Sequence, residues 1–263
     1  MSDMPSPRKA GVRNFPSERS PAVGQCQTVS AWGASSVVGL RRKSNQDRYF
    51  QQGNTFAVAD GMGGLVGGAE ASAATVQSIR HNVSELYMRD PLTKWDSLIR
   101  TVNRETRQTM LNANFQNAGS TLTVTTVEPE RVVVAHVGDS RLYSYRTQTG
   151  ELVQRTIDHN LQNELESQGR NLQDGAAHGI PLAALVSYIG MPDEELRIDV
   201  FSWSPEYHSR LLLCSDGVHG SLSDEEIADV LATFPSLQAA KELTQRADAA
   251  GGRDNSTALV LDL

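Results

Sequence analysis

The sequence has little cysteine and no long hydrophobic run. Its two cysteines, Cys26 and Cys214, are too few and too far apart for a disulfide framework or a zinc site. No uninterrupted apolar stretch approaches the roughly 20 residues that a membrane-spanning helix requires. The first residues also lack the apolar core of a secretory signal. We therefore expect a cytoplasmic protein that makes no membrane contact.

An excess of basic charge is absent as well. The 24 Lys and Arg residues against 31 Asp and Glu residues give a net charge of −7, which argues against binding to nucleic acid. The hydrophobic fraction of 39% and the charged fraction of 21% are those of an ordinary globular protein. With 263 residues, the chain is long enough to bury a large core.

Residues 1–27 differ in composition from the rest of the chain. They are rich in Pro, Ser, Arg and Gly, show no apolar periodicity, and carry a net charge of +2 from four basic and two acidic side chains. Such a segment cannot bury enough apolar surface to fold. We predict a disordered N-terminal tail followed by one folded domain over residues 28–263. A tail that docks onto an acidic partner is the alternative.

Short apolar runs beyond residue 28 predict a series of strands. These lie at 48–50, 55–59, 121–127, 131–137, 141–145, 210–214 and 256–263. The run at 55–59 is predicted to stop at Asp60-Gly61, and the three runs within 121–145 are spaced like an antiparallel meander. Consecutive strands of this kind favour antiparallel sheets over a doubly wound parallel fold.

Amphipathic segments between the strands predict helices. Apolar residues recur at spacings of three and four over 69–86, and further helices are expected at 95–112 and 237–249. Ser223 followed by Glu226 is typical of a capping box at the start of another helix. The fold class is therefore α+β, with helices covering the sheets.

Five aspartates stand beside predicted strand ends, next to glycines or tight turns. They are Asp47, Asp60, Asp139, Asp216 and Asp254. Carboxylates from separate strand ends can converge on one edge of a sheet, and Mg²⁺ and Mn²⁺ prefer oxygen ligands. Taken singly, an Asp-Gly pair after an apolar run is more often a plain turn. The histidines are dispersed, and both His136 and Cys214 lie in apolar strands as core residues would.

Six short motifs in a fixed order resolve this ambiguity. They are RKSNQD at 42–47, VADGMGG at 58–64, GST at 119–121, VGDSR at 137–141, LCSDG at 213–217 and DNST at 254–257. From about Trp32 to the C-terminus the chain resembles the PP2C-type (PPM) metal-dependent serine/threonine protein phosphatases, in their bacterial form. The resemblance implies a four-layer α-β-β-α sandwich of two antiparallel sheets flanked by helices.

The resemblance also implies roles for particular residues. Two Mn²⁺ or Mg²⁺ ions, with a third in bacterial relatives, would be held at the sheet ends. Asp60 would bridge two ions, and Arg42 would grip the substrate phosphate. The other implied ligands are the Gly61 carbonyl, Asp216, Asp254, Asp47 through water, and Asp139, which with Asp216 would bind the third ion. Asp60, Asp216 and Arg42 would form the catalytic group.

The implied reaction is hydrolysis of phosphoserine and phosphothreonine monoesters in proteins by a metal-bridging hydroxide. The implied partners are phosphorylated proteins and a cognate bacterial Ser/Thr kinase, and the implied oligomeric state is a monomer. Residues 160–190 match the region of the mobile flap beside the cleft in this family. These are expectations from the resemblance.

Two departures from the family pattern leave an alternative open. Gln46 stands where an acidic residue is common, which would weaken or alter metal binding, and Met62 stands where eukaryotic relatives often have a histidine. A catalytically weak binding or regulatory module with the same fold is therefore the competing interpretation. A calcium-stabilised structural domain is disfavoured, because the sequence has no contiguous Asp-x-Asp-x-Asp-Gly loop.

Overall fold

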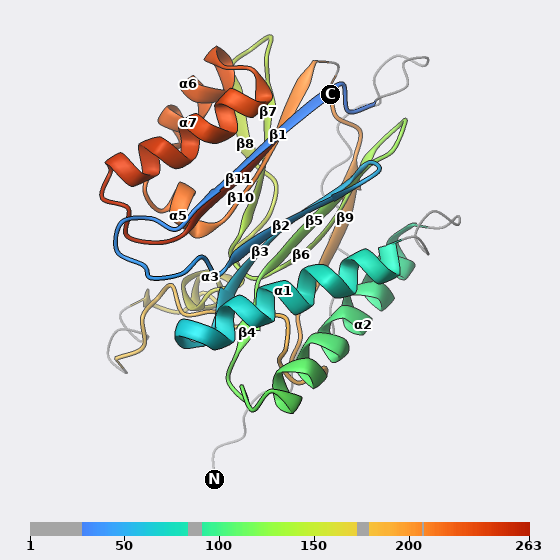
Figure 1. Cartoon of the computed structure of the whole chain (residues 1–263). Helices are drawn as coiled ribbons and strands as arrows, with labels where there is room; N and C mark the ends of the chain where they lie inside the picture. Colours follow the sequence, from blue (N-terminus) through green and yellow to red (C-terminus); the bar gives the residue numbers. More distant parts are fainter. Residues whose placement is uncertain (1–27, 84–90, 173–178, 207) are drawn as a thin grey trace.

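Two antiparallel sheets lie face to face in the computed structural model, and helices cover their outer faces (Figure 1). The structure describes residues 28–83, 91–172, 179–206 and 208–263. Helices α1 and α2 pack on one sheet, while α6 and α7 pack on the other (Figure 1). The predicted α+β class and the four-layer α-β-β-α sandwich are thereby confirmed.

Each sheet is built from strands that are distant in sequence. The first sheet has the order β1 (Ala31–Val37), β11 (Ser256–Asp262), β10 (Ser209–Cys214), β7 (Arg141–Arg146) and β8 (Glu151–Gln154). The second has the order β2 (Asp47–Gln52), β3 (Thr55–Met62), β5 (Leu122–Val127), β6 (Val132–Val137) and β9 (Asp199–Trp203), with β4 (Gly119–Ser120) paired to β3. The helices are α1 (Gly64–Asn82), α2 (Pro91–Asn112), α3 (Leu161–Ser167), α5 (Asp216–His219), α6 (Asp224–Thr233) and α7 (Ser236–Ala249).

The central strands are apolar along their whole length because both of their faces are covered. Phe56 and Val58 of β3 point into the space between the sheets, where they join Leu211, Leu213 and Leu259. Ala57 and Ala59 point the other way, toward α1 and α2. Alternate residues of one strand thus supply two cores. Burial on both faces explains why these strands read as continuous apolar runs rather than alternating ones.

The predicted strand at 55–59 is too short. β3 continues through Asp60 and Gly61 to Met62, because Gly61 and Met62 pair with Ser120 and Gly119 of β4. An Asp-Gly pair is a local turn signal, and a distant strand overrides it here. As a result Asp60 lies within a paired strand, which holds its backbone more firmly than a turn would.

The predicted antiparallel meander over 121–145 is also wrong in one respect. β5 and β6 pair as expected, but the other neighbour of β6 in that sheet is β9. β7 instead pairs with β10 and β8 in the other sheet. The chain changes sheets at Gly138, whose φ of 104° is a conformation that favours glycine. A Cβ there would also lie 2.7 Å from the Cβ of Thr121. Asp139 therefore lies in the connection from β6 of one sheet to β7 of the other.

The predicted helices are present, but some of them begin or end at other residues than expected. The first two helices begin earlier than expected, at Gly64 and Pro91. The Ser223 hydroxyl accepts from the Glu226 backbone N–H and the Glu226 carboxylate accepts from the Ser223 N–H, which confirms the capping box of α6. Cys214 is fully buried, as predicted.

Several elements lacked a clear sequence signal. β1, β8, β9 and α3 were not anticipated, and they are short or lie at sheet edges. The predicted tail at 1–27 lies outside the described residues. Within the predicted flap at 160–190, the structure describes α3 and an isolated bridge from Asn160 to Leu185, and the flap role stays a prediction.

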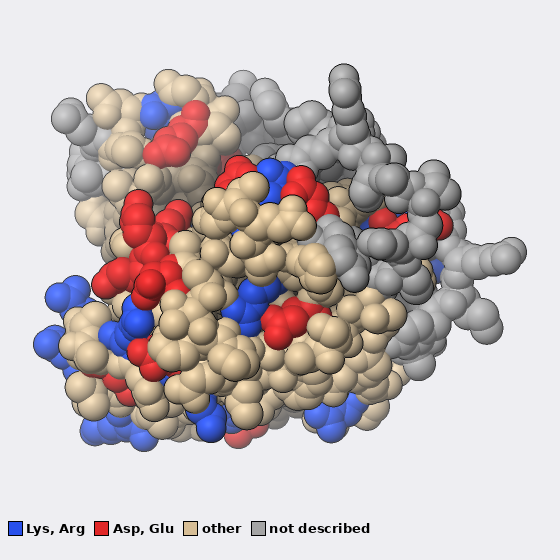
Figure 2. Space-filling view, turned by 90° about the horizontal axis from the view of Figure 1, so that it is seen from above, with Lys and Arg blue, Asp and Glu red and all other residues tan. Residues whose placement is uncertain are grey.

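The outer surface mixes both signs of charge. On the face shown in Figure 2, acidic side chains form several groups, the largest on the left of the view, and basic side chains lie beside them and along the lower edge. α6 contributes to the acidic character of the surface, since its first turn holds Asp224, Glu225 and Glu226. Among the helices that the structure describes, none is both long and apolar enough to cross a membrane.

His136 is a wholly buried histidine in β6. Its Nδ1 lies 2.9 Å from the Thr123 hydroxyl and its Nε2 lies 3.2 Å from the carbonyl oxygen of Ile157. Burial, and secondarily the neighbouring His159, lower the pKa of His136 to about 3. The ring is therefore neutral at physiological pH and contributes to the structure, as its apolar sequence context predicts.

This burial makes His136 a source of acid sensitivity. Below its ordinary pKa the unfolded chain takes up a proton that the folded chain refuses until about pH 3, so stability falls as pH drops below that ordinary value. Replacing His136 with Gln should remove up to about 1.4 kcal/mol per pH unit from the pH dependence of the unfolding free energy. Urea unfolding in EDTA between about pH 7.5 and about pH 5 measures this slope. The exposed His81→Gln is the control, and an unchanged slope in His136→Gln would contradict the assignment.

Candidate metal centre

Two aspartates face each other across neighbouring strands at the end of the second sheet. Asp47 opens β2 and is in register with Asp60 of β3. Like charges directly opposite on adjacent strands destabilise a sheet. The backbone nevertheless holds them there: the Asp60 N–H donates to the Thr121 hydroxyl at 2.9 Å, and its carbonyl accepts from the Thr121 N–H at 2.8 Å.

A third aspartate reaches the same place from the other sheet. Asp216 is the first residue of α5, directly after β10 and the N-cap residue Ser215. The charges of both Asp47 and Asp216 act on the buried Asp60 carboxyl and raise its pKa, so the three carboxyls belong to one group. Ser215 joins the two sheets here, since its hydroxyl donates to Asp47 Oδ2 at 2.7 Å and accepts from the Thr257 N–H at 2.9 Å.

Burial and mutual repulsion raise the pKa values of these carboxyls. The pKa of Asp60 lies well above its usual range because of desolvation and the charges of all four other candidate aspartates. The pKa of Asp216 is raised to about 6 by burial and by Asp254 and Asp47, and burial also raises the pKa of Asp47. The structure therefore brings all five predicted aspartates into one electrostatic group.

Asp254 forms the outer edge of this group and contacts Arg42. The two side chains form an ion pair, with 30% and 45% of their respective surfaces exposed. Arg42 is therefore the one predicted phosphate-binding residue at the boundary between the buried carboxyls and solvent. A guanidinium can present two parallel N–H donors to a phosphate, which an ammonium cannot.

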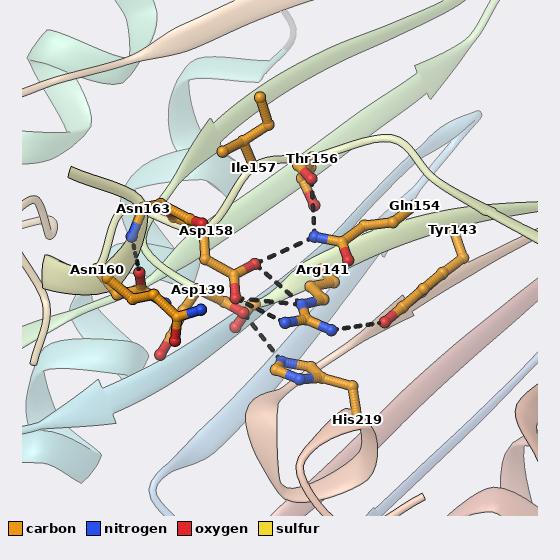
Figure 3. A network of polar contacts seen from close by, with 12 residues as sticks. Asp139, Arg141, Tyr143, Gln154, Thr156, Ile157, Asp158, Asn160, Asn163 and His219 are labelled. Atoms are coloured by element: carbon orange, nitrogen blue, oxygen red, sulfur yellow. Dashed lines mark hydrogen bonds and ion pairs between the residues drawn. The ribbon is translucent and has the colours of Figure 1, made fainter. Parts of the chain in front are cut away.

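Asp139 lies in the turn where the chain crosses between the sheets, and that turn is held from two sides (Figure 3). On one side, Arg141 donates to both carboxylate oxygens of Asp158 at 2.8 to 3.2 Å. On the other side, His219 Nε2 lies 3.0 Å from the Asp139 carbonyl oxygen (Figure 3). Burial, followed by repulsion from Asp216 and Asp158, raises the pKa of Asp139 to about 7.

Two glycines in the predicted motifs are required by close backbone contacts. A Cβ on Gly61 would lie 2.0 Å from the Gly68 carbonyl oxygen, and a Cβ on Gly217 would lie 1.9 Å from the Asn255 carbonyl oxygen. Neither position can accept a side chain without backbone movement. Gly61 therefore lets the segment that carries Asp60 approach α1, and Gly217 lets the segments that carry Asp216 and Asp254 approach each other.

Three residues with structural roles at the site were missed by sequence reasoning. The buried Asn255 accepts from the Gln46 N–H at 2.9 Å and donates to the carbonyl oxygens of Val38 and Ser44 at 2.7 and 3.0 Å. The other two are Ser215 and His219. Asn255 and Ser215 lie inside quoted motifs, and His219 follows Asp216 by three residues on one helix, so proximity in sequence was the available signal.

Gln46 uses its side chain as a hydrogen-bond donor. Its side-chain amide donates to the Gly64 carbonyl oxygen at the start of α1, and its backbone carbonyl accepts from the Gly61 N–H at 3.1 Å. A carboxylate at this position could not donate to Gly64. Gln46 therefore fastens the glycine-rich segment that follows Asp60.

The residues fit a divalent cation by their chemistry. Asp47 Oδ1 and Asp216 Oδ1 are buried with no hydrogen-bond partner among the described residues, which is costly for a carboxylate unless a cation compensates it. Among the described residues, no three or more His, Cys, Asp or Glu side chains are already arranged so that they could hold a metal ion. Asp254, for example, is turned toward Arg42. The donor set is present as a group of oxygens, which is what Mg²⁺ and Mn²⁺ prefer.

The fold and the carboxyl group together define a four-layer α+β sandwich with an oxygen-rich site at the sheet ends. A family model described as protein phosphatase 2C matches residues 41–260, and the chain belongs to that family.

Named relatives agree with this assignment. The serine/threonine protein phosphatase PstP of Mycobacterium tuberculosis is 31% identical over 236 residues, which are 89% of this chain and 45% of PstP. The protein phosphatase PhpP of Streptococcus pneumoniae is 30% identical over 235 residues, which are 86% of this chain and 94% of PhpP. A crystal structure of the catalytic domain of PstP in complex with two manganese ions has a TM-score of 0.76 and 30% identity, and covers 88% of this chain and 97% of that one. The chain thus spans about half the length of PstP.

Crowded carboxyls should make the site destabilising in the absence of a cation. A carboxyl whose pKa is raised in the folded state makes the fold less stable as pH rises from the ordinary pKa through the raised one, so the penalty from Asp60 grows as pH rises above the ordinary range of an Asp. At about pH 7.5 in EDTA, Asp60→Asn should raise the melting temperature by about 2–4 °C for each kcal/mol of repulsion removed. The gain should shrink at about pH 5, where Asp139 and Asp216 take up protons.

Mn²⁺ should reverse the order of the melting temperatures of the parent chain and Asp60→Asn. It should stabilise the parent chain at about pH 7.5 and stabilise Asp60→Asn much less, because binding to the folded state adds to stability. Thermal unfolding followed by circular dichroism measures both effects. Glu70→Gln, at an exposed position on α1, is the matched control. A lower melting temperature for Asp60→Asn in EDTA would contradict the repulsion.

Proposed function

We propose that this chain hydrolyses phosphoserine and phosphothreonine monoesters in proteins as a Mn²⁺- or Mg²⁺-dependent phosphatase. The observation that carries the proposal is the convergence of buried carboxyls from both sheets, with Asp47 and Asp60 in register and Asp216 acting on Asp60 from the other sheet, beside the exposed guanidinium of Arg42. Buried carboxyls suit divalent cations, and the guanidinium of Arg42 suits a phosphate dianion. Membership of the protein phosphatase 2C family supports the same activity.

The aspartates would hold two cations, with a third site beside them. Bound cations would neutralise phosphoryl charge and supply an activated water. Asp60 would bridge two ions. The Gly61 carbonyl, Asp216 and Asp254 would complete the direct ligands, Asp47 would act through water, and Asp139 with Asp216 would hold the third ion.

The remaining residues keep these groups in position. Ser215 and Asn255 tie Asp47 and the loop before it to the segments that carry Asp216 and Asp254. These hydrogen bonds are buried or partly buried, and they oppose a separation of the carboxyls that would relieve their repulsion. Arg42 would exchange part of its contact with Asp254 for the substrate phosphate. Such preorganised charge is the main catalytic contribution in phosphoryl transfer.

The biological setting follows from the same proposal. The substrates would be proteins phosphorylated on Ser or Thr, and a Ser/Thr kinase would supply them, since dephosphorylation requires a preceding phosphorylation. We propose a cytoplasmic monomer. A PP2C-fold binding module without turnover is the second candidate, and the use of the Gln46 amide in place of a carboxylate is the observation that favours it.

Turnover separates the two candidates. With Mn²⁺ or Mg²⁺, the chain should hydrolyse p-nitrophenyl phosphate and a phosphothreonine peptide, and EDTA should abolish both reactions. Asp216→Asn should lower kcat/KM at least about a hundredfold, the scale of one lost electrostatic contact in a transition state. A folded chain that binds Mn²⁺ but hydrolyses neither substrate would favour the binding module.

The proposed role of Arg42 has its own test. Arg42→Lys keeps the charge but loses the two parallel donors, so kcat/KM for p-nitrophenyl phosphate should fall about tenfold. Mn²⁺ affinity, measured by isothermal titration calorimetry, should stay within a few-fold of the parent. Equal kcat/KM values in Arg42→Lys and the parent would exclude bidentate phosphate binding.

A further inference from the structure

Basic residues stand beside Arg42 on two loops that meet next to Asp254. Residues 38–46 contain three cations, Arg41, Arg42 and Lys43, and no acidic residue. The segment before β11 contributes Arg253, next to Asp254. This local excess of positive charge contrasts with the net charge of −7 of the whole chain. We call Arg41, Lys43 and Arg253 the basic rim.

Hydrogen bonds hold the two segments of the basic rim together. The backbone N–H groups of Leu40 and Arg41 both donate to the Gly252 carbonyl oxygen, at 2.8 and 3.1 Å. Asn255 also donates to the Ser44 carbonyl oxygen at 3.0 Å. A Cβ on Gly39 would lie 2.1 Å from the Asp254 carbonyl oxygen, so the loops are in direct contact. The rim is therefore a fixed feature of the site and is built from both loops.

The basic rim is available to a ligand. Arg41, Lys43 and Arg253 are all exposed. Arg42 has an ion-pair partner in Asp254, whereas no ion pair from the three rim residues occurs within the described ranges. The three exposed cations stand on two loops in direct contact, so an anionic ligand beside these loops would gain from all three charges.

We propose that the basic rim recognises acidic residues that flank the phosphorylated side chain, so that phosphoproteins with acidic segments are the preferred substrate class. The inference rests on the proposed function, because it takes the phosphate to be bound at Arg42. The phosphate would lie between the carboxyl site and Arg42, while the flanking carboxylates pair with the rim.

The spacing of a peptide suits this arrangement. An extended chain advances about 3.3 Å per residue, and Arg41 and Lys43 are the immediate sequence neighbours of Arg42, with Cα atoms about 3.8 Å away. A phosphorylated residue at Arg42 therefore brings side chains two or three positions away within reach of the rim. Exposed ion pairs are individually weak and salt-sensitive, so the preference should depend on ionic strength.

The test compares three phosphothreonine peptides of equal length. They carry Glu, Gln or Lys at the second and third positions on either side of the phosphothreonine, and p-nitrophenyl phosphate serves as a substrate without flanks. With Mn²⁺ in low salt, kcat/KM should be about five- to tenfold higher for the Glu peptide than for the Gln peptide. The order should be Glu, Gln, Lys, and about 0.3 M NaCl should compress the differences.

A triple variant isolates the basic rim. Arg41→Gln/Lys43→Gln/Arg253→Gln should bring the Glu and Gln peptides to within twofold of each other and leave kcat/KM for p-nitrophenyl phosphate within twofold of the parent. A control triple, Arg80→Gln/Arg104→Gln/Lys241→Gln, removes the same charge from α1, α2 and α7 and should keep the preference.

The outcomes separate the two proposals. Equal turnover of the three peptides by the parent chain would overturn the inference, as would a preference that survives in the rim triple variant. Equal loss in both triple variants would also overturn it, because net charge would then explain the effect. Failure to hydrolyse p-nitrophenyl phosphate and every peptide would instead refute the proposed function itself.

Discussion

Repulsion among buried carboxyls is the constraint on which the rest of this structure depends. Asp47 and Asp60 face each other across β2 and β3, and Asp216 approaches from the opposite sheet. Left to themselves, such groups would separate or stay protonated, and their raised pKa values express that cost. A chain that keeps them together stores unfavourable energy at one end of its sandwich. A divalent cation, or a pair of them, would convert that energy into binding affinity.

The fold resists this repulsion because each carboxyl is fixed by backbone that is held elsewhere. β3 runs through Asp60 to pair with β4, and the Ser215 hydroxyl links Asp47 to the strand that contains Thr257. The sandwich supplies the rigidity, because its central strands are covered on both faces. Glycines at 61 and 217 remove the side chains that would otherwise keep these segments apart. The packed sheets thus supply the stability that offsets the repulsion among the carboxyls at their ends.

Charge of the opposite sign lies just outside the carboxyl group. Arg42 pairs with Asp254 at the boundary with solvent, and further cations follow along the same loop. The arrangement places acidic groups where cations would be held and basic groups where a phosphorylated peptide would arrive. Asn255 joins both loops by hydrogen bonds, so the segment that carries Asp254 and the segment that carries Arg42 are connected directly. Under the proposed function, this connection would link metal binding to substrate recognition.

The sequence by itself determined the fold class, the capping box of α6 and the identity of the five aspartates, because burial, caps and turns leave local signals. It did not determine where the strands pair. The extension of β3 past Asp60, the change of sheet at Gly138 and the contact between His219 and Asp139 all depend on residues that are far apart in the chain. The edge elements β1, β8 and β9 were likewise invisible, since they owe their form to neighbouring strands. Only the tertiary structure could bring the carboxyls into contact, because pairing and packing between distant segments set those positions.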